Sequence, residues 1–192
     1  MLERALQLCE KIGDYRGQAW ANILYGRLRA TAEKDYEGAF ASLHAVIHMG
    51  TASGGFQHEV SYTFTRAAEA LLRLGRYREA FEYCHQGLAI SLKVSNKLEY
   101  GYGYMVLGEL HASEAYQDWD KAAWYLEESC KAFREVGAQI DVGRAHLAGA
   151  RMALLRQDGS ARQWTETART IFMERGAKAL QKEAEELLAT LD

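Results

Sequence analysis

The 192 residues are 48% hydrophobic and 26% charged, which is the composition of a folded chain and excludes intrinsic disorder. Lysine and arginine number 23 against 26 acidic residues, a net charge of -3, and no basic run supplies the phosphate-neutralising patch that nucleic-acid binding needs. No segment approaches the roughly 18 consecutive apolar residues of a membrane span, and the N-terminal residues lack a signal-peptide pattern. We therefore expect a cytoplasmic protein that binds neither nucleic acid nor membrane.

Apolar residues at three- and four-residue spacing predict helices along the whole chain, joined in pairs by short polar turns. Proline is absent, which favours long uninterrupted helices. Asn96 is expected to cap the helix that follows it, and the link 51–55 is the most flexible point that the sequence indicates. In chain order the predicted helices cover residues 2–12, 16–31, 36–49, 61–74, 78–94, 98–111, 121–136, 142–155, 161–174 and 178–191.

Three interleaved series of small residues repeat with a period of about 41. The first is Gly26, Ala68, Gly108 and Gly149, the second is Gly13, Gly54, Ser95, Gly137 and Gly176, and the third is Ala39, Ala80, Ala122 and Ala161. A period of this size marks a helical hairpin that buries its apolar face only by stacking on copies of itself. Small residues are required where the two helices of a hairpin cross, because the axes approach to about 8–10 Å there.

The series predict an all-α solenoid that forms a single domain over residues 1–192. A half repeat covers 1–13, four repeats cover 14–55, 56–96, 97–138 and 139–176, and a capping helix covers 177–192. The first helix, 2–12, matches the second helix of a repeat without its partner. From this we expect an excised piece of a longer protein, or a chain without an N-terminal cap.

Gly75-Arg-Tyr77, followed by Ala80 and Gly87-Leu88, resembles the tetratricopeptide repeat family, as do Leu107-Gly108 and Tyr25-Gly26. The resemblance implies a right-handed superhelix of antiparallel helix pairs that binds proteins or peptides. The period is longer than the family's usual 34 residues, and the proline that ends its unit is missing. Such long repeats are similar to the C-terminal arms of large bacterial signalling ATPases, cyclases and transcriptional activators, as is the ending Phe133-Arg-Glu-Val-Gly-Ala138.

The resemblance places the binding surface on the concave side, which is formed by the first helix of each pair, helix A. We call Gly26, Ala68, Gly108 and Gly149 the landmarks. If they are equivalent, three sets of residues on the A helices align. One set is aromatic, and aromatic side chains are enriched at interface hot spots. The alternative is that the rings pack between neighbouring A helices and that the charges form a solvated face. With Arg73, the candidate partner-binding residues are Trp20, Tyr62 and Tyr102, then Ile23, Thr65, Met105 and His146, then Arg27, Glu69 and Glu109.

We expect neither catalysis, nor a metal, nor a cofactor. His44 and His48 lie four apart on one helix, but no third ligand accompanies them. No serine or cysteine lies in a nucleophile motif such as GxSxG, and the glycine pairs do not form phosphate loops. The three cysteines are far apart and fall in apolar helical stretches, so we expect buried reduced thiols.

The sequence thus predicts a non-catalytic scaffold for protein–protein interaction. Two alternatives remain open at this stage. One is a receptor for a small molecule or a signalling peptide, which would need a deep pocket with converging polar groups. The other is homo-oligomerisation through the unpaired N-terminal helix, whose apolar surface would be exposed.

Overall fold

The computed structural model of the chain describes residues 2–53 and 57–191. Every regular element in this described part is helical and none is a strand, so the predicted all-α fold is confirmed. A π-helical turn, η1 (Arg29–Glu33), directly follows α2. The α-helices are α1 (Leu2–Ile12), α2 (Tyr15–Leu28), α3 (Tyr36–Ser53), α4 (Gln57–Arg73), α5 (Tyr77–Lys93), α6 (Lys97–Ala112), α7 (Trp119–Glu135), α8 (Gln139–Arg156), α9 (Ala161–Glu174) and α10 (Lys178–Ala189).

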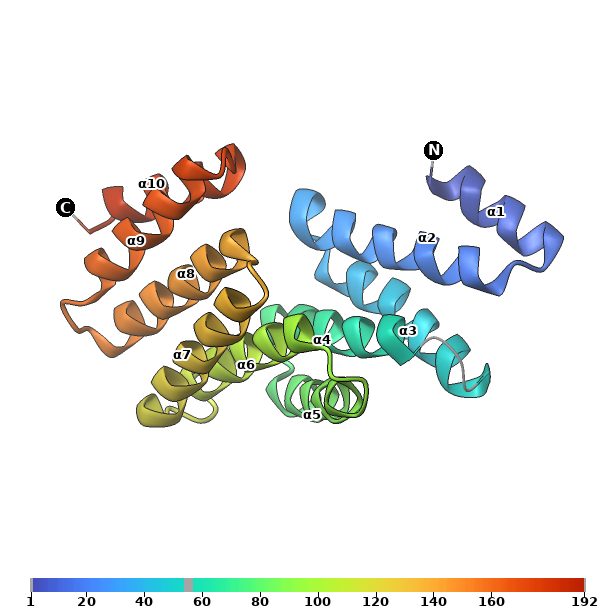
Figure 1. The fold of residues 1–192 in the computed structure, drawn as a ribbon, viewed down its shortest axis with the longest axis horizontal. Helices are drawn as coiled ribbons and strands as arrows, with labels where there is room; N and C mark the ends of the chain where they lie inside the picture. Colours follow the sequence, from blue (N-terminus) through green and yellow to red (C-terminus); the bar gives the residue numbers. More distant parts are fainter. Residues whose placement is uncertain (1, 54–56, 192) are drawn as a thin grey trace. The chain divides into compact units, whose positions relative to one another are not determined.

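The chain divides into two compact units, Met1–Glu99 and Tyr100–Asp192, with the division inside α6. Within each unit consecutive helices pack as antiparallel neighbours (Figure 1), which is the arrangement of a helical-hairpin repeat. We call α2, α4, α6 and α8 the A helices, and α3, α5, α7 and α9 the B helices. That the repeats form a single continuous array stays a prediction.

The small landmark residues lie where an A helix meets the B helix of its own hairpin. A Cβ atom added to Gly26 would lie 2.6 Å from Cγ of Leu43, and one added to Gly108 would lie 2.6 Å from Cγ of Leu126. At Gly149 the same atom would lie 2.6 Å from Cε3 of Trp164. Because a real Cβ does not approach so closely, a larger residue at these three glycines would require the facing side chain or its helix to shift.

The second series marks the ends of the B helices. Gly13, Gly137 and Gly176 have φ values of 70, 72 and 66°, and Ser95 has 52°. A residue in this left-handed conformation ends a helix, and glycine adopts it without steric cost. Gly54 lies outside the described residues.

Short polar side chains begin several of the helices. The carboxylate of Asp14 accepts a hydrogen bond from the Gly17 amide at 2.9 Å, and Asp118 accepts one from the Lys121 amide at 3.2 Å. Asn96 accepts from the Glu99 amide at 3.4 Å, which confirms the predicted cap. Each such bond satisfies one amide that has no partner within its own helix.

Each unit has its own core between adjacent hairpins. In the N-terminal unit, Leu43 and Ile47 of α3 pack against Val60 and Phe64 of α4. In the C-terminal unit, a cluster joins α8, α9 and α10 through Leu147, Ala168, Phe172 and Ala184, and Leu180 and Leu187 pack against it. The last helix therefore packs against the α8/α9 hairpin; that it is a cap stays a prediction.

The sequence-based boundaries differ from the observed ones by a few residues. The first A helix does not run unbroken to residue 31, because α2 ends at Leu28 and continues as the π-helical turn. The hydroxyl of Thr31 in that turn donates to the Arg27 carbonyl at 2.7 Å. The predicted link 51–55 is partly helical, since α3 extends to Ser53; residues 54 and 55 lie outside the described part.

Candidate partner-binding face

The landmark glycines define which side of an A helix is available to a partner. Gly26 faces α3, and each residue turns a helix by about 100°. Leu24 is therefore about 200° away from Gly26 and points away from α3. By the same geometry, Arg66 on α4 points away from the side of Ala68, which is 0% exposed. We call this outward side the A-helix face.

Three large apolar side chains are exposed on the A-helix face of α2. Trp20, Leu24 and Leu28 are 48%, 42% and 41% exposed, and they follow one another at intervals of four residues. Residues four apart lie one above the other on a helix surface, so these three form one continuous stripe. Arg27, which is also exposed, lies beside it.

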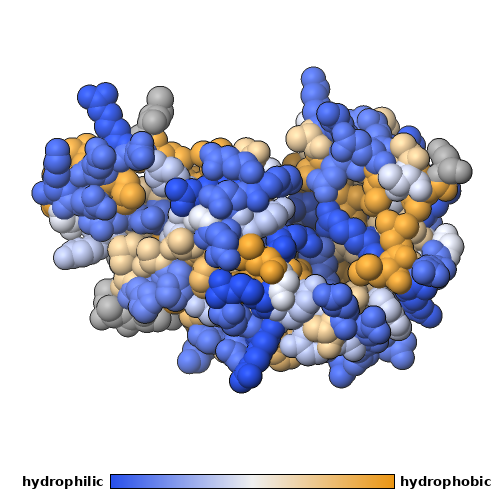
Figure 2. All heavy atoms as spheres, turned by 180° about the vertical axis from the view of Figure 1, so that it is seen from behind, coloured by the Kyte–Doolittle hydropathy of each residue, from blue (hydrophilic) through white to orange (hydrophobic). Residues whose placement is uncertain are grey.

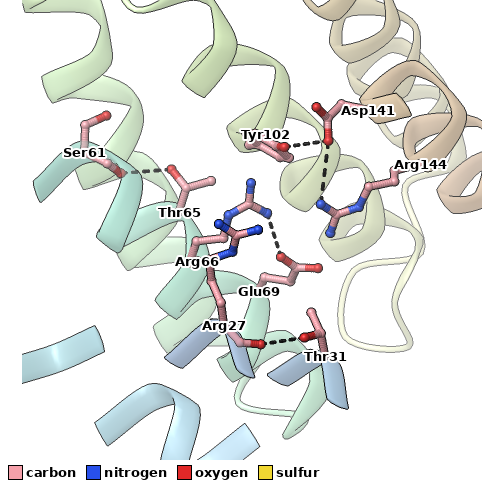
Figure 3. A network of polar contacts seen from close by, with 9 residues as sticks. All are labelled: Arg27, Thr31, Ser61, Thr65, Arg66, Glu69, Tyr102, Asp141 and Arg144. Atoms are coloured by element: carbon pink, nitrogen blue, oxygen red, sulfur yellow. Dashed lines mark hydrogen bonds and ion pairs between the residues drawn. The ribbon is translucent and has the colours of Figure 1, made fainter. Parts of the chain in front are cut away.

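The neighbouring helix α4 contributes polar and aromatic groups to the same unit. The Arg66 guanidinium lies 5.1 Å from the centre of the Tyr62 ring. The same group lies 3.0 Å from a carboxylate oxygen of Glu69 (Figure 3). Tyr62 also packs against the buried cluster of Ala19, Ile23 and Val46. Tyr62 is therefore half-buried between elements, as one of the sequence-based alternatives expects.

In the C-terminal unit, the tyrosine equivalent to Tyr62 is Tyr102, and its side chain is held by contacts within the unit. The Tyr102 hydroxyl donates to Asp141 at 2.5 Å, and the Tyr102 ring packs edge-on against Phe133 with centroids 4.9 Å apart. The guanidinium of Arg144 lies 3.7 Å from Asp141 and 5.7 Å from the centre of the Tyr102 ring (Figure 3). Tyr102 is only 8% exposed, so its ring offers little surface to a partner.

A second polar chain connects α6, α8 and α10 in the C-terminal unit. Arg151 of α8 donates to Glu109 of α6 at 3.1 Å and to Glu183 of α10 at 2.6 Å. Arg151 and Glu183, with Leu147, Glu186, Leu187 and Thr190, line an open hollow of about 240 Å³. This volume is below the range of about 300–1,000 Å³ that is typical of small-molecule pockets.

Several predicted binding residues are interior. Ile23, Thr65 and Met105 are 2%, 1% and 3% exposed, so their side chains present almost no surface to a partner. Their position explains this: a residue three before the landmark is turned by about 300°, which leaves it only about 60° from the buried side. The Thr65 hydroxyl donates to the Ser61 carbonyl at 3.1 Å (Figure 3).

His146, the fourth residue at this position, lies between three helices of the C-terminal unit. Its ring centroid is 5.0 Å from that of Trp164, and Nε2 is 3.4 Å from Nη2 of Arg134. Burial, and secondarily the Arg134 charge, lower the pKa of His146 to about 4. The imidazole is therefore neutral near pH 7 and acts as a packing group.

The A helices of the N-terminal unit carry more positive charge than the chain as a whole. The Asp, Glu, Lys and Arg residues of α2 and α4 are four arginines (Arg16, Arg27, Arg66, Arg73) and two glutamates (Glu59, Glu69), which gives 4 minus 2, or +2, against -3 for the entire sequence. Arg66 pairs with Glu69 at 3.0 Å, and Arg16 pairs with Glu59 at 3.2 Å. Arg27 and Arg73 are exposed.

Leu24, Leu28, Arg66 and Arg151 were not among the sequence-predicted binding residues. The sequence does contain a signal for the two leucines, because they continue the four-residue spacing of Trp20 along one helix. Comparing one position per repeat could not detect that spacing. Arg66 and Arg151 follow from the same geometry, as each lies two residues from a landmark.

Other exposed apolar side chains occur away from the A-helix face. Leu92 on α5 and Met173 on α9 are 64% and 59% exposed, and Figure 2 shows hydrophobic side chains reaching the surface among hydrophilic ones. Scattered exposure of this kind is normal for folded proteins. The α2 stripe differs from it in being three large residues in register on one helix.

The structure also shows the surroundings of the histidine pair and of two cysteines. The rings of His44 and His48 meet edge-on at 4.5 Å, and no group of three or more potential metal ligands occurs in the described part. Burial raises the pKa of the Cys130 thiol to about 11 and raises that of Cys84 further. None of the described helices has the length and apolarity that a bilayer span demands.

Among solved structures, the chain is similar to the crystal structure of BtubC (BKLC) from P. vanneervenii. The TM-score is 0.64 with 13% sequence identity, over 99% of this chain and 89% of that one. At this identity the likeness shows the fold alone, and it supports a helical repeat. The TPR2AB domain of yeast Sti1 in its pHSP90 complex aligns over 98% of this chain and 96% of that one at 16% identity, but with a TM-score of 0.32, too low to carry an argument. The sequence matches no protein-family model and no curated protein.

Proposed function

We propose that this protein is a non-catalytic interaction scaffold that binds a peptide or a segment of another protein on its A-helix face. The observation that carries the proposal is the stripe of Trp20, Leu24 and Leu28, three large apolar side chains exposed in register on the side of α2 that faces away from α3. Desolvating such side chains provides most of the binding free energy at protein interfaces.

The repeat architecture supports the same function. Each hairpin uses its buried side for stacking, which leaves the outward side of every A helix free to vary and to recognise partners. The resemblance of the repeat to arms of bacterial signalling ATPases, cyclases and transcriptional activators supports a place in a larger regulatory protein. The residues we assign to recognition are Trp20, Leu24, Arg27, Leu28, Tyr62, Arg66, Glu69 and Arg73.

The test is selection from a displayed library of random peptides against the folded chain. We expect enriched peptides whose affinity falls at least about tenfold, or 1.4 kcal/mol, on Trp20→Ala combined with Leu24→Ser. The matched controls are Leu92→Ser and Met173→Ser, which remove apolar groups that are more exposed than Trp20 and Leu24 from B helices and should leave the affinity unchanged. Peptides that bind the Trp20/Leu24 variant as well as the parent would refute the site.

Homo-oligomerisation is a second candidate function, favoured by a different observation. Leu8 and Ile12 on α1 are 59% and 68% exposed, and α1 buries none of its residues completely. An exposed apolar helix face of this kind favours self-association. Light scattering should then show a dimer or larger species that Ile12→Glu converts to monomer, whereas a monomeric parent at high concentration would exclude this function.

A further inference from the structure

The stripe and the charges beside it narrow the class of partner. We propose that the A-helix face of the N-terminal unit binds an amphipathic α-helix of another protein, one that carries acidic side chains beside its apolar face. This rests on the proposed function, because it names the partner of the same site.

The spacing of the stripe favours a helical ligand over an extended one. Trp20, Leu24 and Leu28 cover eight residue steps, about 12 Å of helix at 1.5 Å per residue. Side chains four apart form a ridge, and such a ridge packs into the groove between the ridges of a second helix. The ligand helix would then present apolar residues at i, i+3 or i+4, and i+7, the pattern with which helices dock on apolar surfaces.

The charges around the stripe favour an acidic ligand. In α2 and α4 the glutamates are already neutralised, Glu59 by Arg16 and Glu69 by Arg66. Arg27 lies next to Leu28 and three residues from Leu24, and it is the charged residue of α2 that forms no ion pair in the described part. A carboxylate one turn from the apolar face of the ligand would reach this guanidinium, which can bind it in a bidentate manner.

The charge of the rest of the chain strengthens the preference. The net charge of the whole sequence is -3, so the residues outside α2 and α4 sum to -5, because -3 minus +2 is -5. An acidic ligand would be repelled by most of the surface and attracted to this face. Complementary charge of this kind determines orientation and association rate as well as affinity.

The A helices of the C-terminal unit do not offer the same features. From Tyr100 onward α6 and α8 contain three arginines (Arg144, Arg151, Arg156) and two acidic residues (Glu109, Asp141), a sum of +1. Their polar groups are bound to one another in the Tyr102–Asp141–Arg144 and Glu109–Arg151–Glu183 contacts. The inference therefore applies to the N-terminal unit.

The experiment uses the full chain and three fluorescein-labelled peptides, each 16 residues long. The first is an amphipathic helix with leucine at i, i+4, i+7 and i+11 and glutamate on both flanks of that face. The second replaces every glutamate with lysine. The third keeps the acidic composition but places proline at the centre, which breaks a helix. Fluorescence anisotropy gives Kd for each at low salt.

We expect the glutamate peptide to bind at least about tenfold more tightly than the other two, and its Kd to rise with salt concentration. Arg27→Glu should remove the preference for glutamate over lysine, whereas Arg78→Glu on α5, whose side chain is 91% exposed, should preserve it. Leu24→Ser should weaken the glutamate peptide about tenfold. If Leu24→Ser alters the circular dichroism spectrum, Leu24→Gln replaces it.

Three results would overturn the inference. One is equal or tighter binding of the lysine or the proline peptide, and another is binding of the glutamate peptide that is insensitive to both Arg27→Glu and Leu24→Ser. The third is a dimer of the chain that Leu24→Ser dissociates, since the occupant would then be a second copy. Failure of all three peptides, while library-selected peptides still depend on Trp20 and Leu24, would refute the acidic helix and leave the proposed function intact.

Discussion

The A-helix faces of the two units use one framework with different side chains. In the N-terminal unit Trp20 is exposed, and arginines outnumber glutamates. In the C-terminal unit the tyrosine equivalent to Trp20 is buried and its hydroxyl is bound to Asp141. The repeat period thus preserves the small residues at the helix crossings, while the side chains around them differ between the two units. A partner that binds the A-helix face of one unit is therefore not expected to bind that of the other.

The hairpin crossings show the same divergence in the interior. In the α4/α5 hairpin, Ser61 and Ser91 meet with their hydroxyl oxygens 2.6 Å apart. The equivalent positions in α6/α7 are Gly101 and Phe133, where an added Cβ would lie 2.5 Å from the ring. Gly143 and Phe172 repeat that pairing in α8/α9. A large ring on one helix requires the absence of a side chain on the other, since interiors are packed to nearly crystalline density.

The largest expected effect tests this difference between crossings. Phe133→Ala should lower the free energy of unfolding by about 3–5 kcal/mol, because it empties a fully buried site opposite a glycine that cannot fill it. Ser91→Ala should cost only about 1 kcal/mol, since Ser61 retains its bond to the Gly87 carbonyl. Urea unfolding of the two variants measures both values. Similar losses for the two would contradict a packing role specific to the ring.

The next effect compares ion pairs in the two units. Arg151→Met removes a partner of the Glu109 carboxylate, whose side chain is 7% exposed, and should cost about 1–3 kcal/mol. Arg16→Met breaks the pair with Glu59, in which the arginine side chain is 67% exposed, and should cost about 0–1 kcal/mol. The double variant Glu109→Gln/Arg151→Met should recover part of the loss. An equal cost for the two single variants would show that burial does not govern these pairs.

The fold was predictable because its requirements fall on distinctive residue types. Glycine recurs periodically in the sequence at helix crossings and at left-handed helix ends. Ser95 occupies one of these helix ends and has the same left-handed conformation, with a φ of 52°. The sequence placed the turns from A to B helices in the other three repeats, but it did not identify the residue that adopts the left-handed conformation in each. There the left-handed residues are Lys34, Gln117 and Gln157, whose side chains carry no sign of that conformation.

The candidate site was less predictable, because a column across repeats does not specify which way a side chain points. Trp20 and Arg27 were predicted to lie on the surface and are exposed, whereas Ile23 was predicted to lie there and is buried. A three-residue offset from the landmark keeps a side chain near the buried side, while a two-residue offset moves it to the opposite side. Tyr102 was aligned correctly with Trp20, but no sequence pattern predicted the hydrogen bond from its hydroxyl to Asp141, 39 residues away.

A smaller effect depends on pH and belongs to the C-terminal unit. The pKa of His146 is lowered to about 4, below the ordinary value of about 6.5. Between these two pH values the unfolded chain binds a proton that the folded chain does not, so stability falls as the pH drops through this window. His146→Gln should therefore lose less Tm than the parent between pH 7 and pH 5.

The matched control for this effect is His85→Gln, which changes an exposed histidine of the N-terminal unit. Differential scanning calorimetry at the two pH values supplies the Tm differences. If His85→Gln reduced the loss of Tm as much as His146→Gln does, the surroundings of His146, namely Trp164 and Arg134, would not be the cause of the pH dependence.

The smallest effect on stability is expected at the residue with the largest proposed role in binding. Trp20→Ala should change the free energy of unfolding by no more than about 0.5 kcal/mol, because nearly half of the side chain is already in water. Tyr102→Phe, at the equivalent position of the other unit, deletes only a hydroxyl yet should cost about 1.5 kcal/mol, since its acceptor is a carboxylate. Urea midpoints, compared at constant m-value, show which of the two variants loses more stability. A tryptophan that contributed more to folding than the Tyr102 hydroxyl would be a packing residue, and the case for α2 as a recognition helix would then rest on Leu24 and Leu28 alone.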